Sequence, residues 1–222
     1  MIFLRCPHGR HSRQCLASAC LVLWICAEMS AANAWSLTIN SDDRRLFLHV
    51  GNGDVSGTRG TLNGAPGRSG PVNVVAVTVP VAQLGNGTEM PMTSNSTQNI
   101  SLYGDGNNTC PTPASQVMVG AGYRRNGNGG ANATLTVASP ANLTNANGDT
   151  IPISQIRWTV AAPGSGVPNV ISAGMFNGGV QTLASVPPNR YLENCHTFVY
   201  ANSAMRAAGT YVGRVTYTLT AP

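Results

Sequence analysis

Apolar and polar residues alternate at every second position through much of the chain, and this pattern constrains the fold more than any other feature. Residues 211–219 carry mainly apolar side chains at odd positions, and residues 214–220 carry polar side chains at even positions. Shorter stretches at 46–50, 117–123, 133–137 and 154–160 repeat the pattern. Successive side chains of a strand point to opposite faces, so the pattern predicts half-buried strands.

Turn-forming residues separate these stretches. Gly, Asn and Asp cluster at residues 51–54, 85–87, 104–108 and 147–149, and such residues tolerate the positive φ that tight turns require. Short strands with turn signals between them predict an all-β fold, a single β-sandwich of about 8–10 short, mainly antiparallel strands.

One stretch departs from the alternation. Residues 72–81 are apolar on both faces, with Val75, Val77 and Val79 on one side and Val74 and Ala76 on the other. This pattern predicts a central strand that is covered on both faces.

The N-terminal region has the organisation of a secretory signal peptide. A basic stretch with three arginines precedes an apolar run from residue 16 to 27, and Ala32–Ala34 follows as a small-x-small cleavage site. The apolar run is shorter than the roughly 20 residues that a transmembrane helix needs. We expect cleavage between Ala34 and Trp35, which leaves residues 35–222 as one exported domain without a transmembrane segment. The alternative is a buried N-terminal helix. The periplasm, the cell surface and the extracellular space all fit such a chain.

Cysteine usage agrees with export. Four of the six cysteines lie in the predicted signal peptide, so only Cys110 and Cys195 remain in the mature chain. Two cysteines in an exported chain predict one disulfide, with a pair of free thiols as the alternative. A zinc site is not predicted, because the two cysteines lack the paired spacing of zinc ligands.

Charged residues are sparse. They make up 9% of the chain, which contains no lysine. Residues 35–222 hold ten arginines and seven acidic residues, a formal net charge of +3. The arginines are dispersed along the sequence with two adjacent pairs, so no basic stripe is present and no nucleic-acid partner is expected.

Residues suited to catalysis are few. The mature chain has two histidines, His49 and His196, and no Gly-x-Ser-x-Gly elbow. Cys195 and His196 are neighbours, and neighbours on a strand point to opposite faces. Glu89 and Glu193 are its only glutamates, and nothing in the sequence pairs them as a glycosidase would require. We therefore expect no enzymatic activity and no cofactor.

Acidic residues in polar turns raise the possibility of a calcium site. Asp54, Asp105 and Asp149 lie in Gly- and Asn-rich turns, where oxygen ligands for Ca²⁺ are common. The complete EF-hand pattern is missing, and we predict no metal site.

Aromatic residues suggest an alternative function as a carbohydrate-binding, lectin-like module with glycan partners. Such modules use exposed rings as apolar platforms. The candidates are Tyr103, Tyr123, Trp158, Tyr191 and Tyr211. Trp158 alternates in phase with Ile156 and Val160, which also fits a core position.

The C-terminal residues resemble a known family. Residues 208–219, which read AGTYVGRVTYTL, resemble the closing strand of spore coat protein U and related secreted pilin-like domains, and residues 198–202 resemble their penultimate strand. The resemblance implies an immunoglobulin-like sandwich assembled on the cell surface through a chaperone–usher route. Its implied partners are other copies of the chain, pilus-type subunits and a periplasmic chaperone. The expected role is structural or adhesive.

Pilin assembly requires a donor strand that one subunit supplies to its neighbour by β-augmentation. Residues 35–50 are the candidate donor, with alternating apolar side chains at Leu37, Ile39, Leu46, Leu48 and Val50. Charged residues at 42–45 interrupt this segment, so two ordinary strands of a self-complete fold are an equal alternative.

Overall fold

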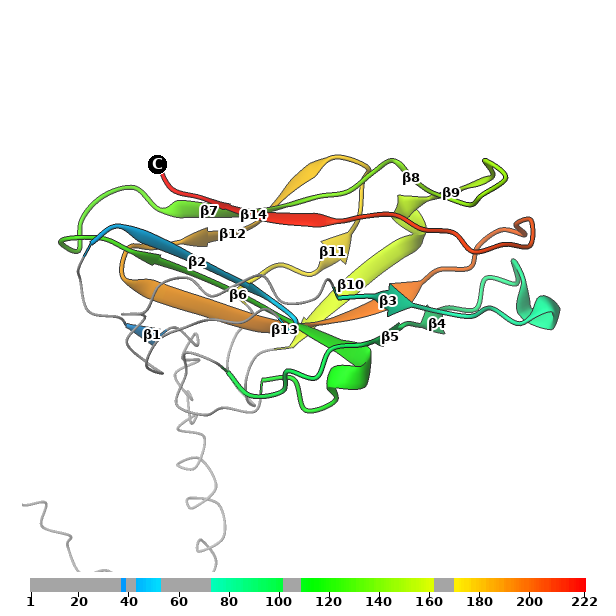
Figure 1. Cartoon of the computed structure of the whole chain (residues 1–222), viewed down its shortest axis with the longest axis horizontal. Coiled ribbons are helices and arrows are strands. Elements are labelled where there is room, and N and C mark those ends of the chain that lie inside the picture. Colours follow the sequence, from blue (N-terminus) through cyan, green and yellow to red (C-terminus); the bar gives the residue numbers. More distant parts are fainter. Residues whose placement is uncertain (1–36, 39–42, 53–72, 102–108, 162–169) are drawn as a thin grey trace, which may run out of the picture. The chain divides into compact units, whose positions relative to one another are not determined.

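A computed structural model describes residues 37–38, 43–52, 73–101, 109–161 and 170–222. These residues belong to one compact unit that spans residues 32–222 (Figure 1). The predicted cleavage site at Ala34–Trp35 and the candidate donor residue Ile39 lie outside the described residues.

The larger sheet is built around one long strand, β13 (Arg190–Tyr200). Its strands follow the order β11 (Gly174–Met175), β10 (Ile156–Ala161), β13, β6 (Gln116–Arg124) and β2 (Arg45–Val50). Two short strands, β1 (Leu37–Thr38) and β4 (Met90–Pro91), also pair with β13.

The smaller sheet has the order β12 (Val180–Val186), β7 (Ala133–Ala138) and β14 (Thr216–Thr220). Two further pairs are β3 (Val75–Ala76) with β5 (Thr93–Ser94) and β8 (Asn142–Thr144) with β9 (Thr150–Pro152). Three single turns of 3₁₀ helix, η1 (Val81–Gln83), η2 (Pro113–Ser115) and η3 (Ile153–Gln155), are the only helical segments of the described residues.

The prediction of an all-β, antiparallel fold is confirmed, since every pair of strands in the described residues is antiparallel. These residues form fourteen strands, more than expected, because several strands contain only two residues.

The two sheets face each other across one apolar core (Figure 1). Strand β6 contributes Val117, Val119, Ala121 and Tyr123 to this core, in the alternating phase that the sequence predicted. The facing sheet contributes Ala133, Leu135, Val137, Leu183 and Val186. Each fully buried Val or Leu side chain stabilises the fold by about 1.5–3 kcal/mol relative to exposure.

The outer face of the larger sheet is also buried. Phe47 and His49 of β2, Met118 of β6, and Tyr191 and Glu193 of β13 all lie on this face, and each is almost fully excluded from solvent. The strands β6 and β13 are therefore buried on both sides.

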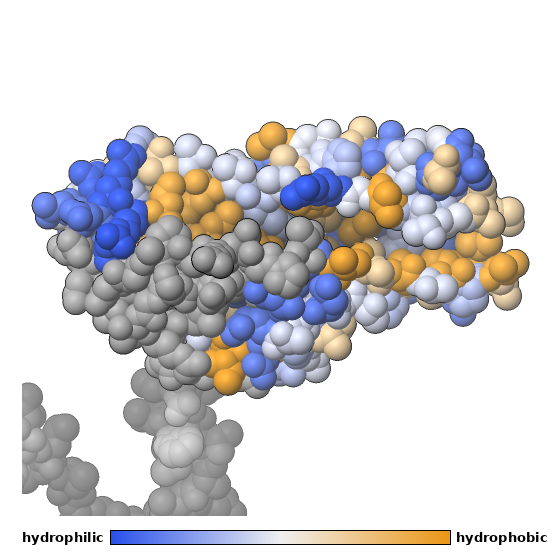
Figure 2. Space-filling model, viewed as in Figure 1, coloured by the Kyte–Doolittle hydropathy of each residue, from blue (hydrophilic) through white to orange (hydrophobic). Residues whose placement is uncertain are grey.

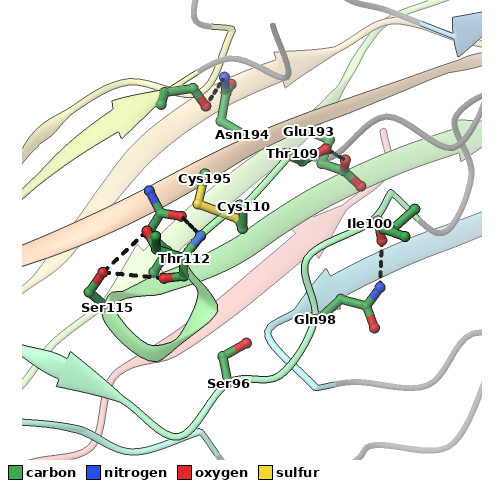
Figure 3. The surroundings of a disulfide bond; sticks show 12 residues. Ser96, Gln98, Ile100, Thr109, Cys110, Thr112, Ser115, Glu193, Asn194 and Cys195 are labelled. Carbon is green, nitrogen blue, oxygen red and sulfur yellow. Dashed lines mark hydrogen bonds between the residues drawn. A yellow bond between two sulfur atoms is a disulfide. The ribbon is translucent and has the colours of Figure 1, made fainter.

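The disulfide fastens part of this cover. Cys110 and Cys195 are bonded, with 5.4 Å between their Cα atoms, and both residues are fully buried (Figure 3). The predicted pairing is thus confirmed. It ties the segment before β6 to the middle of β13, and a closed loop of this length stabilises a fold by about 4–5 kcal/mol on the chain-entropy model.

The prediction of a doubly covered strand at residues 72–81 is wrong. Only Val75–Ala76 forms a strand there, and Val74 is 56% exposed. Val75, Val77 and Val79 pack against the core, whereas the alternate positions face solvent. The apolar side chains at the alternate positions, such as Val74, are therefore exposed although the sequence pattern predicted their burial. Pro80 also removes a backbone donor that a central strand would need.

Buried asparagines hold the loops in place. Asn202 is fully buried with a φ of 50°. Its side-chain amide donates to the Gln83 carbonyl at 2.7 Å, and its Oδ1 accepts from the Gly85 amide at 2.9 Å. Asn194 accepts hydrogen bonds from the amides of Val170 and Ile171 in the same way. These amides satisfy backbone groups that would otherwise be buried without partners.

Candidate functional site

The candidate site is an open side of the fold, where one terminal strand of each sheet lies beside the other. Strand β2 is the last strand of the larger sheet, and β14 is the last strand of the smaller sheet. They run along the same side of the domain (Figure 1). In the described part of the chain β14 pairs with β7 alone, so its second edge offers backbone donors and acceptors to another strand.

A groove of about 470 Å³ separates these two strands. Six residues line it: Arg44, Arg45, Leu46, Leu219, Thr220 and Ala221. Its apolar side chains are continuous with the core, because Leu46, Leu219 and Ala221 pack against core residues. Leu48, further along β2, is 37% exposed. Figure 2 shows the resulting apolar patch between β14 and β2, next to hydrophilic residues at the end of the domain.

The hydrophilic end of the groove is fixed by a contact between its two walls. The Arg44 guanidinium, just before β2, donates a hydrogen bond to the backbone carbonyl of Pro222, just after β14. The groove therefore combines an apolar floor with a cationic end.

The structure separates the two halves of the predicted donor segment. Leu37 lies in β1, opposite Tyr191 of β13. Leu46, Leu48 and Val50 lie in β2 and pair with β6 of the same chain. Residues 45–50 thus form an ordinary strand of the domain, as the self-complete alternative describes for this half, and the first two of them line the groove.

The two histidines are buried on opposite faces of the larger sheet. His196 faces the core, where its ring stacks on Trp158 at 6.4 Å between centroids. Neither ring nitrogen of His196 has a hydrogen-bond partner in the described residues. Burial lowers the pKa of His196 to about 3, so the ring is neutral at physiological pH. Cys195 points to the other face, towards Met118, as strand geometry predicted.

A buried carboxyl cluster on the outer face was not predicted. The Glu193 carboxyl accepts a hydrogen bond from the Thr109 hydroxyl at 2.6 Å (Figure 3). It also accepts hydrogen bonds from the hydroxyls of Tyr191 at 2.9 Å and Ser101 at 3.2 Å. Burial raises the pKa of Glu193, and the three hydrogen bonds oppose that shift. The only sequence signal was that Glu193 shares the phase of Cys195 along the chain. The cluster lies beside the disulfide and is closed to solvent, so it has the character of a structural site.

The second glutamate of the mature chain is part of a different structure. Glu89 forms an ion pair with Arg157 at the surface. Glu89 is therefore exposed and ion-paired, whereas Glu193 is buried and hydrogen-bonded to three hydroxyl groups. The two carboxyl groups do not face a common cleft.

The candidate aromatic platform and the candidate calcium turns find little support in the described residues. Tyr123, Trp158 and Tyr191 are buried, and Tyr103 lies outside the described residues. Tyr211 is half-buried and donates its hydroxyl to the Ala207 carbonyl. Asp149 accepts a hydrogen bond from the Asn145 side chain, whereas Asp54 and Asp105 lie outside the described residues.

The described residues hold neither a cluster of metal ligands nor a membrane-spanning helix. No group of three or more His, Cys, Asp or Glu side chains lies close enough to hold a metal ion. No helix in this part of the chain is long and apolar enough to cross a membrane.

Comparison with known proteins does not add a relative. No family model, no curated protein and no solved structure matches this chain. The fold and the groove define an antiparallel all-β domain with an open sheet edge, and its function has to be inferred from that geometry.

Proposed function

We propose that this chain is an exported structural or adhesive subunit with an immunoglobulin-like, pilin-like sandwich, which associates with other copies by strand exchange. The groove between β2 and β14 is the observation that carries the proposal. It joins a strand edge that pairs with no other strand among the described residues to apolar side chains that continue into the core. These are the two features that β-augmentation uses, because the edge supplies hydrogen bonds and the pockets select alternate side chains.

The donor in this proposal is the segment that precedes β2. Trp35, Leu37 and Ile39 supply apolar side chains at alternate positions, as a strand inserted over an apolar floor requires. Residues 45–50 are excluded as a donor, because each of them pairs with β6 in the same chain. Strand β1 forms only two residue pairs with β13, so this pairing joins it to its own domain over a short length.

Export is part of the proposal and has its own support. The buried disulfide between Cys110 and Cys195 belongs to an oxidising compartment. The signal-like N-terminal sequence gives a route to that compartment.

Light scattering coupled to size-exclusion chromatography tests the proposal. The chain, purified from an oxidising compartment, should form species larger than a monomer. Leu219→Arg places a charge in the groove and should shift the protein to monomer. Val180→Arg is the matched control, since Val180 is 70% exposed on β12, the opposite edge of the smaller sheet. A monomeric wild-type protein, or equal assembly of both variants, would refute strand exchange at this groove.

A lectin-like function that uses the five candidate aromatic rings as a sugar platform is not favoured. Three of its five candidate rings are buried in the described structure, so they cannot stack on a sugar from solvent.

A further inference from the structure

Arginines that are dispersed in the sequence meet at one end of the larger sheet. The antiparallel register of β2 and β6 places Arg45 directly opposite Arg124. The register of β6 and β13 places Arg190 opposite Tyr123, one residue away from Arg124. Arg44 and Arg125 flank the same positions. The pairing of these strands therefore brings arginines that are far apart in the sequence to one end of the larger sheet.

Half of the arginines of residues 35–222 lie at this end of the larger sheet. They are five of ten, and the only acidic residues next to them in sequence are Asp42 and Asp43. We call this part of the domain the arginine end and define it by Arg44, Arg45, Arg124, Arg125 and Arg190.

The arginine end has two clefts, with Arg44 between them. One is the hydrophilic end of the groove described above. The other has a volume of about 460 Å³ and is lined by Asp43, Arg44, Tyr123, Arg125, Asn126, Ala131 and Pro222. Each cleft falls in the range of about 300–1,000 Å³ that small-molecule sites occupy. Neutral hydrogen-bonding groups, such as Asn126 and Thr220, stand beside the guanidinium groups.

The scaffold beneath the clefts is fixed. Arg124 is almost fully buried, and its Nε donates to the Asp43 carbonyl at 3.3 Å. Its guanidinium carbon lies 6.0 Å from the centre of the Phe47 ring. Arg44 is exposed and Arg125 is half-buried, and both line the 460 Å³ cleft, so these two side chains are accessible from solvent. Arg124 instead contacts the backbone of Asp43, next to Arg44.

We propose that the arginine end binds an acidic polysaccharide, with carboxylate groups of successive sugars in the two clefts on either side of Arg44. Guanidinium groups bind carboxylates in a bidentate geometry, and the neutral groups suit sugar hydroxyls. Two clefts separated by a side chain fit discrete anionic groups along a polymer better than the flat surface of a bilayer. The proposal does not require strand exchange, but a donor strand would compete for one of the two clefts, because that cleft is the end of the groove between β2 and β14.

Binding of the intact chain to polygalacturonate, with neutral dextran as the reference polymer, tests this proposal. Interferometry should show binding to polygalacturonate alone, and binding should weaken as NaCl shortens the Debye length. The double variant Arg44→Gln/Arg125→Gln should weaken binding about tenfold or more. The control Arg157→Gln/Arg214→Gln removes the same charge elsewhere and should change binding less than about twofold. Arg44→Glu, a single change at an exposed position, gives a second route to the same result.

Each other outcome overturns the proposal. It is refuted if polygalacturonate does not bind, or if the control double variant loses as much affinity as the test variant. Binding to phosphatidylglycerol vesicles without binding to polygalacturonate would assign the arginine end to lipid phosphate instead. The folding of each variant is checked by its melting temperature, and a variant that does not fold is replaced by Arg44→Glu.

Discussion

Lowering the pH should destabilise this protein through one residue, His196. The folded protein holds the His196 pKa near 3, compared with an ordinary value of 6.5. The depressed value means that the unfolded chain binds the proton more readily than the folded one. The stability that neutral His196 contributes is therefore complete above pH 6.5 and is lost as the pH falls from 6.5 towards 3.

The size of the effect follows from the pKa difference. Each pH unit between the two pKa values costs about 1.4 kcal/mol of unfolding free energy. At pH 5 the loss is about 2 kcal/mol, and at pH 4 it is about 3.4 kcal/mol. Full burial and the stacked Trp158 ring leave no room for water to solvate the charged imidazolium.

Urea unfolding of the wild-type protein and of His196→Phe, each at pH 7.5 and pH 5, measures this effect. The variant changes packing as well as charge, but the packing contribution is the same at both pH values. The difference in unfolding free energy between the two proteins should therefore shift by about 2 kcal/mol in favour of the variant at pH 5. Other titrating groups are shared by both proteins and cancel. A difference that stays constant between the two pH values would refute the buried, neutral state of His196.

Three further predictions concern single residues. Gly120→Ala should destabilise the fold by about 1–3 kcal/mol, because the added Cβ would lie 2.0 Å from the Tyr191 hydroxyl oxygen; Gly129→Ala, which meets no atom within 4 Å, should leave the melting temperature unchanged. Asn202→Ala should cost about 1–3 kcal/mol in urea unfolding, because it leaves buried backbone groups unsatisfied; an unchanged midpoint would contradict its role. The raised pKa of Glu193 makes the wild-type fold lose stability as the pH rises. Glu193→Gln should therefore become more stable relative to the wild-type protein when the pH is raised from 4 to 8. Urea unfolding midpoints of both proteins at the two pH values measure this difference, and an unchanged difference would contradict the prediction.

The sequence predicted the elements whose burial follows a local pattern. Strand β7 buries every second residue, and β14 does the same less completely, as their alternation indicated. The disulfide was also predictable, because only two cysteines remain after residue 34. In each case the pattern or count is sufficient without knowledge of distant contacts.

The remaining features depend on contacts between distant segments, which the alternation does not encode. Strands β6 and β13 are buried on both faces. On the outer face, Ser101, Thr109 and Cys110 contact Glu193 and Cys195 of β13. The polar side chains of β13 therefore occupy buried positions that hydropathy alone assigns to the surface. The arginine end could not be predicted for the same reason, because its arginines come together only through the register of β2, β6 and β13.

The groove between β2 and β14 is most directly tested by the binding of its proposed occupant. A fluorescent peptide with the sequence of residues 35–43 is titrated into the chain that lacks residues 35–42, and its anisotropy is recorded. Strand exchange predicts saturable binding that is lost when the acceptor carries Leu219→Arg and kept when it carries Val180→Arg. Absence of binding by a folded acceptor, or equal binding of a scrambled peptide, would contradict the account.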